Sequence, residues 1–197
     1  MTRPGARVGW LLALGLAVGT GWVVARPGKG SVPEEGRFGF GRPADSAEIR
    51  RLDIDVRPDG RGLPPGEGTV ARGRVVYAAR CLACHGATGR EGPYDVLVGR
   101  VPGDAFPFAN DPRIPSTVGN YWPYATTVFD YVRRAMPFDA PGSLPVNDVY
   151  SVTALLLFWN NLVPEGIVLN RSSLPAVEMP ARDRFVRDNR TGGPVVR

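Results

Sequence analysis

The chain has 197 residues and a formal net charge of +5 at pH 7, which allows one domain with extensions. Its basic residues form no long block and no nucleic-acid-binding motif is visible, so the charge does not indicate a nucleic-acid partner. The 25 glycines and 20 prolines exclude a regular helical bundle or a long parallel sheet and indicate much irregular backbone.

The first 25 residues are typical of an export signal. A short basic head with Arg3 and Arg7 precedes the uncharged apolar run Val8–Ala25, which ends on a small residue. The run is near the lower length limit of a membrane span, so two outcomes remain open: cleavage as a signal peptide, or retention as a membrane anchor through residues 8–25. A buried core helix fits poorly, because arginines flank the run. Either outcome places the rest of the chain in the periplasm, at the outer face of the cytoplasmic membrane.

Residues 26–68 are predicted to form an extended arm that wraps on the following domain. The arm has one helical candidate, Asp45–Arg51, with Asp45 or Ser46 as its N-cap and Glu48 in its first turn. Apolar residues elsewhere in the arm favour packing on the domain, because a flexible linker would not carry them.

Three later segments have apolar residues at helical spacing. They are residues 69–83, 124–135 and 146–162. The long loop-rich stretch between the first two indicates a segment that wraps a large ligand. We therefore predict an all-α domain over residues 69–162, followed by a polar, proline-rich tail over residues 163–197.

The first and last of these helices are expected to cross. At the crossing, Gly73 and Tyr77 should face Leu155 and either Phe158 or Trp159. A glycine at this point would allow the two helices to approach closely.

Cys81 to His85 form a C-x-x-C-H motif that contains both cysteines and the one histidine of the chain. Two thiols at this spacing can bond covalently to the vinyl groups of a haem, and the adjacent histidine can bind the iron from one face. The export signal supports this interpretation, because such haems are attached outside the cytoplasm. The motif predicts one covalently attached haem c, held by Cys81, Cys84 and His85.

Three other roles for the cysteine pair are less well supported. A disulfide would close a tiny loop and stabilise little. A thioredoxin-like redox pair needs a βαβ context, which is missing. A zinc site needs further ligands, and the chain has no other cysteine or histidine.

The opposite face of the iron needs a ligand other than histidine. Methionine is the usual partner in an electron-transfer haem, and besides the initiator Met1 the chain has Met136 and Met179. Met136 precedes Pro137, which disfavours helix at this position and so places the sulfur on a loop between two helices. Met136 is the predicted second iron ligand. Met179 in the tail and an open five-coordinate iron are the alternatives.

Four further residues are weaker candidates around the haem. The backbone carbonyl of Pro93 could accept a hydrogen bond from the second ring nitrogen of His85. Tyr121, Trp122 and Arg100 could donate to the haem propionates. Core packing for the aromatic residues and simple surface exposure for the arginine are the ordinary alternatives.

These residues together resemble a class I cytochrome c domain over Thr69–Leu162. A wider resemblance, over roughly residues 38–185, is to the cytochrome subunit of bacterial sulfite and sulfur dehydrogenases. It is carried by three stretches: "DIDVRPDGRGLPPGEGTVARG", "GNYWPYATTVFDYVRRAMPFDAPGSLPVNDVYSVTALL" and "MPARDRF". Some relatives have a second haem domain, whereas this chain has one haem motif.

The resemblance implies a periplasmic cytochrome that accepts electrons from a molybdopterin dehydrogenase subunit, with Cys81, Cys84, His85 and Met136 as haem residues. We therefore expect the chain to transfer single electrons, onward to a downstream cytochrome or oxidase, without substrate chemistry of its own. A generic respiratory shuttle and a haem enzyme or sensor with an open iron position are the alternative functions.

Overall fold

The structure is a computed structural model that describes residues 41–101, 106–107 and 110–186. The predicted signal or anchor, residues 1–25, lies outside the described residues. The chain divides into two compact units, residues 1–43 and 44–197, and all elements described below belong to the second. Among the described residues, no helix is both long and apolar enough to cross a membrane.

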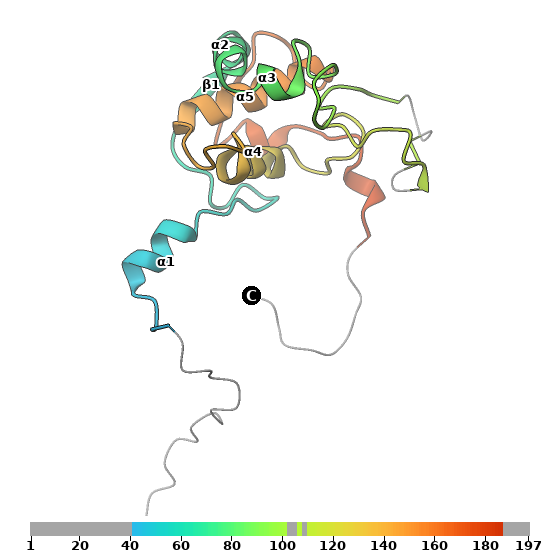
Figure 1. Ribbon diagram of the computed structural model, residues 1–197. Coiled ribbons are helices and arrows are strands. Elements are labelled where there is room, and N and C mark those ends of the chain that lie inside the picture. Colours follow the sequence, from blue (N-terminus) through green and yellow to red (C-terminus); the bar gives the residue numbers. More distant parts are fainter. Residues whose placement is uncertain (1–40, 102–105, 108–109, 187–197) are drawn as a thin grey trace, which may run out of the picture. The chain divides into compact units, whose positions relative to one another are not determined.

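The second unit is helical with one small sheet (Figure 1). Its helices and strands are α1 Ser46–Leu52, β1 Glu67–Thr69, α2 Val70–Arg80, α3 Leu82–His85, α4 Ala125–Ala135, α5 Val146–Trp159 and β2 Val168–Asn170, followed by the 3-10 helices η2 Leu174–Ala176 and η3 Arg182–Arg184. The predicted helices are confirmed. The first of them divides at Cys81 into α2 and the short α3.

Helix α5 is the centre of the core. Its side chains are buried from Val149 to Leu157, and both α2 and α4 pack against it. At the crossing with α2, a Cβ atom on Gly73 would lie 2.1 Å from the carbonyl oxygen of Ser151, so only glycine permits this approach. One turn further along α2, the Tyr77 ring packs edge-on against Trp159, with 4.8 Å between centroids. The predicted crossing is confirmed.

The sheet and the end of the chain differ from the prediction. Strands β1 and β2 pair antiparallel with Gly68 opposite Leu169, so the fold is not purely α-helical. The segment predicted to be a polar tail contributes Leu169, Leu174 and Met179 to the hydrophobic core. The apolar residues of this segment are few and are separated by polar residues and prolines. They therefore show neither the 3.6-residue period of a helix nor the two-residue period of a strand.

The described part of the arm, residues 41–68, combines an exposed helix with a packed segment. Of the two predicted N-caps of α1, Asp45 is the one that caps the helix, and it forms a capping box with Glu48: the Asp45 carboxylate accepts from the Glu48 amide, and the Glu48 side chain accepts from the Asp45 amide. No residue of α1 is buried, whereas Val56 and Leu63 beyond it join the core. The arm therefore packs on the domain through the residues that follow α1.

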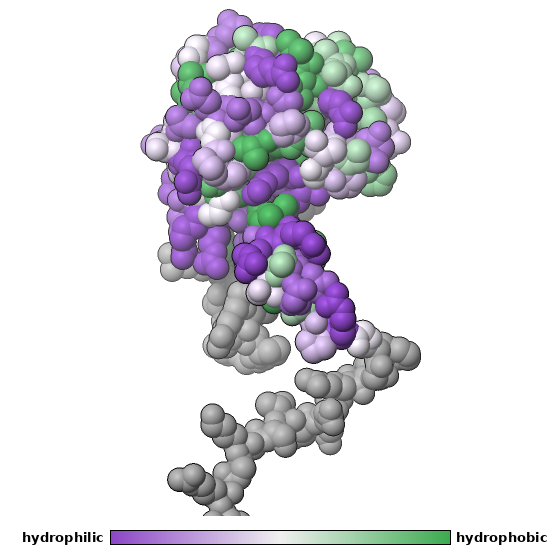
Figure 2. Space-filling model, turned by 90° about the vertical axis from the view of Figure 1, so that its left-hand side faces the viewer, coloured by the Kyte–Doolittle hydropathy of each residue, from purple (hydrophilic) through white to green (hydrophobic). Residues whose placement is uncertain are grey.

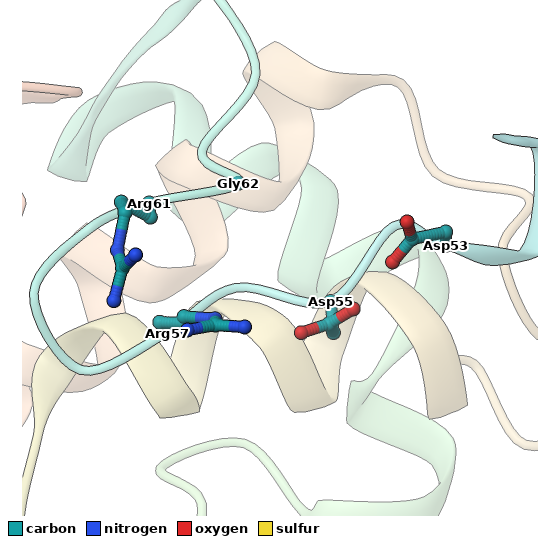
Figure 3. Close-up of a pocket in the computed structure, with 5 residues that line it drawn as sticks. All are labelled: Asp53, Asp55, Arg57, Arg61 and Gly62. Carbon is teal, nitrogen blue, oxygen red and sulfur yellow. The ribbon is translucent and has the colours of Figure 1, made fainter. Parts of the chain in front are cut away.

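The surface of this unit is mainly hydrophilic on the face that Figure 2 shows, with hydrophobic residues interspersed in small groups. An open polar hollow lies where the arm turns back on itself (Figure 3). It is lined by Asp53, Asp55, Arg57, Arg61 and Gly62.

Candidate haem site

The C-x-x-C-H motif occupies the turn that joins α2 to α3. Thr69 caps the start of α2 by accepting from the Arg72 amide at 3.3 Å. Cys81 ends α2, and its carbonyl accepts from the amides of Cys84 and His85 at 3.2 and 3.0 Å. All five residues therefore belong to one helical turn. Cys81 is half-buried, Cys84 is exposed, and both thiols are free.

The state of the thiols bears on the alternative roles of the pair. Burial raises the pKa of Cys81 to about 11, against a smaller opposing effect of Arg80. The thiol is therefore protonated at neutral pH, unlike the low-pKa thiolate of a thioredoxin-like site. No cluster of three or more histidine, cysteine, aspartate or glutamate side chains that could hold a metal ion occurs among the described residues.

His85 is oriented by the loop that follows the motif. Its Nδ1 lies 2.9 Å from the carbonyl oxygen of Asp95. The prediction that the Pro93 carbonyl holds the ring is therefore wrong. The loop crosses the motif closely: a Cβ atom on Gly92 would lie 2.1 Å from the Cys84 carbonyl oxygen, which accepts from the Tyr94 amide at 3.2 Å. With Nδ1 engaged as a donor to a carbonyl, Nε2 is the ring nitrogen available to bind iron.

Tyr77 supports the motif in a way that the sequence did not indicate. Its hydroxyl donates to the carbonyl of Gly86 at 2.9 Å, which ties the residue after His85 back to α2. Burial raises the pKa of Tyr77 far above its usual range, so the hydroxyl remains a donor. The helical pattern identified Tyr77 only as a packing residue, because the path of the loop to Gly86 cannot be read from the pattern.

The two candidate methionines differ in their surroundings. Met136 is the C-cap of α4 in extended conformation, and its amide donates to the Val132 carbonyl at 3.3 Å. Its side chain is half-buried at the edge of the core. Met179 is 4% exposed and lies within the core itself.

Half-buried apolar residues from several elements pack against the edge of the hydrophobic core. Cys81, Leu97, Trp122 and Met136 are among them, and come from the end of α2, the long loop and the end of α4. Two free thiols on one turn, a histidine with one nitrogen engaged and a half-buried thioether match the donors that a covalently bound, six-coordinate haem requires. The residues present therefore fit this group.

The candidates for the propionates come from two segments that the structure brings together. The Val101 amide donates to the Asn120 side chain at 2.6 Å, so the segments that carry Arg100 and Tyr121 are neighbours. Arg100 and Tyr121 are exposed. Trp122 is half-buried and packs edge-on against Tyr131, with 5.6 Å between centroids.

Asn160 is a further residue that the sequence did not single out. It is buried at the end of α5, where its Oδ1 accepts from the Gly99 amide at 3.0 Å. Its Nδ2 donates to the carbonyls of Leu97 and Leu156 at 3.2 and 2.8 Å. One amide side chain thus fixes the long loop to the central helix.

Comparison with known protein families shows which class of protein the chain belongs to. Residues 68–156, which contain the motif and Met136, match the family described as cytochrome C oxidase, cbb3-type, subunit III. The chain is a c-type cytochrome with a cytochrome c fold, a class whose cofactor is haem c and whose activity is electron transfer.

A similar solved structure shows which group of c-type cytochromes the chain resembles. The sulfane dehydrogenase SoxCD from Paracoccus pantotrophus contains a chain that is 40% identical to this one. The match covers 81% of both chains with a TM-score of 0.65. The chain therefore belongs to the family of c-type cytochromes that resemble SoxD, the cytochrome subunit of that enzyme. No match was found among curated proteins.

Proposed function

We propose that this protein is a periplasmic monohaem cytochrome that accepts single electrons from a molybdopterin sulfite or sulfur dehydrogenase subunit. The observation that carries the proposal is the 40% identity to a chain of SoxCD over 81% of both chains. The match extends well beyond the domain that carries the haem motif, so it includes parts that a generic cytochrome c does not need.

The proposal assigns one haem to the site, attached through Cys81 and Cys84, with His85 and Met136 as iron ligands. When bound, the haem supplies one-electron transfer through the ferric and ferrous states of its iron. The carbonyl of Asp95 holds the His85 ring in the tautomer that leaves Nε2 free.

Burial supports Met136 over Met179 as the second ligand. Met179 is enclosed by the core, and bringing its sulfur to an iron would open a cavity there, at a cost of about 2–5 kcal/mol for a side chain of this size. Met136 lies at the edge of the core in an extended cap, where its side chain is already half-buried.

The proposed location follows from the apolar run Val8–Ala25 and its basic head. Export through this segment, whether it is cleaved or stays as an anchor, brings the apoprotein to the compartment where haem c is attached. A downstream cytochrome or oxidase would take the electrons.

Reduction by the partner tests the proposal directly. The haem-loaded ferric protein is mixed in a stopped-flow instrument with the purified molybdopterin subunit and sulfite or another reduced sulfur compound. Rapid reduction that requires both subunit and substrate would support the proposal. A haem that a generic respiratory donor reduces, but the dehydrogenase subunit does not, would favour the respiratory shuttle instead.

A further inference from the structure

Residues 54–58 of the arm, here called the strap, lie along α4 and run in the opposite direction. Figure 3 shows the strap at Asp55 and Arg57, passing along this helix. Three of its backbone groups bond to side chains of α4. They are the Pro58 carbonyl with the Thr126 hydroxyl (3.2 Å), the Val56 amide with the Asp130 carboxylate (2.8 Å) and the Ile54 carbonyl with the Arg133 guanidinium (3.0 Å).

The partners on α4 follow one another at intervals of four and three residues, so they form one face of the helix. The strap therefore contacts α4 from its first turn to its last. Val56 is buried and belongs to the core, which fixes the strap in register along the helix.

Asp130 is the centre of these contacts. Its side chain is 11% exposed, and its Oδ1 accepts both from the Val56 amide and from Arg134 Nε at 3.0 Å. Its Oδ2 accepts from Arg134 Nη2. One carboxylate thus joins the strap to the last turn of α4, and a carboxylate in this position needs both partners because an unpaired charge would be costly to bury.

The last turn of α4 sets the position of Met136. The helix ends at Ala135, and the Met136 amide bonds to Val132 within the same turn that carries Arg133 and Arg134. Helix ends open more readily than helix centres. The strap holds this particular end through Asp130 and Arg133.

We propose that the strap positions the sulfur of Met136, with Asp130 as the positioning residue. The inference rests on the proposed function, in which Met136 binds the iron. When the strap contacts are lost, the last turn of α4 opens more often and the thioether leaves the iron more often, while the covalent attachment of the haem through α2 and α3 is unaffected.

Imidazole binding to the ferric, haem-loaded protein measures this opening. Imidazole enters only when the methionine has left, so the rate at saturating imidazole equals the rate of opening. The test variant is Asp130→Asn. The matched control is Asp148→Asn, which disrupts a similar pair with Arg72 (2.9 and 3.1 Å) between α5 and α2. The two aspartates have similar exposure, 11% and 15%.

The amide oxygen of Asp130→Asn can still accept from the Val56 amide, but the new NH2 group cannot accept from Arg134 Nη2, so the link between the strap and the last turn of α4 is weakened. We expect this variant to raise the opening rate about tenfold, the effect of losing one hydrogen bond to a charged group. Asp148→Asn should change it less than about twofold, since the ion pair that it disrupts joins α5 to α2. Arg133→Gln provides a second variant that removes the bond to Ile54 and leaves Asp130 paired. It should raise the rate in the same direction.

Equal rates in Asp130→Asn, Arg133→Gln and Asp148→Asn would overturn the inference. If Asp130→Asn does not fold, the comparison of Arg133→Gln with Asp148→Asn decides alone. The ferric charge-transfer band of methionine ligation, recorded first on the unmodified protein, separates the two possible failures. Its absence would overturn the ligand assignment and the inference with it, whereas a normal band with unchanged rates would overturn the inference only.

Discussion

The close approach of α2 and α5 at Gly73 supports a quantitative prediction. In Gly73→Ala the new Cβ would lie 2.1 Å from the Ser151 carbonyl oxygen and 2.9 Å from Leu155 Cβ. Cβ contacts in real structures essentially never fall below 3.0 Å, so the two helices must move apart by about 1 Å. The new atom would clash with the Ser151 backbone and with the Cβ of Leu155, and no rotamer change can move either of them.

The expected cost follows from two opposing effects. Overpacking of this kind destabilises by about 3 kcal/mol. Alanine has a higher helix propensity than glycine, which offsets this loss of stability by about 1 kcal/mol. The net loss of about 2 kcal/mol should lower the melting temperature of a domain of this size by about 4–8 °C.

Thermal unfolding of the haem-loaded protein, followed by circular dichroism, measures this change. Gly166→Ala is the matched control, because Gly166 has an ordinary φ and nothing within 4 Å of its Cβ position. It should change stability by less than about 0.5 kcal/mol. Equal melting temperatures for the two variants would refute the reasoning that the α2–α5 contact needs a glycine.

Three further predictions concern the surroundings of the motif. Tyr77→Phe removes the hydrogen bond to the Gly86 carbonyl and should cost about 1 kcal/mol in chemical denaturation; an unchanged midpoint would show that the bond contributes nothing. Asn160→Ala leaves the Gly99 amide without its partner and removes one of the two hydrogen bonds to the Leu97 carbonyl, which still accepts from the Val118 amide. It should cost about 2–3 kcal/mol and reduce the protection of the Gly99 amide in hydrogen exchange, and retained protection would contradict this. In protein prepared without haem, Cys81 has a pKa of about 11 because it is buried. Iodoacetamide should therefore alkylate the exposed Cys84 first at pH 8, with the Cys81 rate rising as the pH approaches 11; equal rates at pH 8, measured by mass spectrometry, would contradict the burial of Cys81.

The helices and their starts could be predicted from the sequence because each has a local signal. Asp45, one of the two predicted N-caps, caps α1, and the apolar spacing of α2 and α5 predicted which faces meet. The capping residues and the 3.6-residue period act within one element, so no knowledge of the rest of the chain was needed.

The features that the sequence did not predict depend on contacts between distant segments. Strands β1 and β2 have three residues each and show no alternating pattern of their own, so their pairing became visible only in the fold. Met179 was assigned to a polar tail because its apolar neighbours lie far away in sequence, on elements of the core.

The hydrogen-bond acceptor for the His85 ring is another feature that the sequence alone did not predict correctly. The sequence predicted the carbonyl of Pro93, in the stretch "EGPY", as the acceptor for the His85 ring. The close passage of Gly92 over the Cys84 carbonyl fixes the path of the loop and brings Asp95 to Nδ1. The motif predicted the kind of hydrogen bond, and tertiary packing selected the residue.

The ferric absorption spectrum of two methionine variants tests the central claim most directly. Haem-loaded Met136→Ala should lose the charge-transfer band of methionine ligation, because Met179, the other candidate ligand, is enclosed in the core. Met179→Ala should keep the band while losing about 2–5 kcal/mol of stability through the cavity it leaves. A band that survives in Met136→Ala and disappears in Met179→Ala would contradict the account.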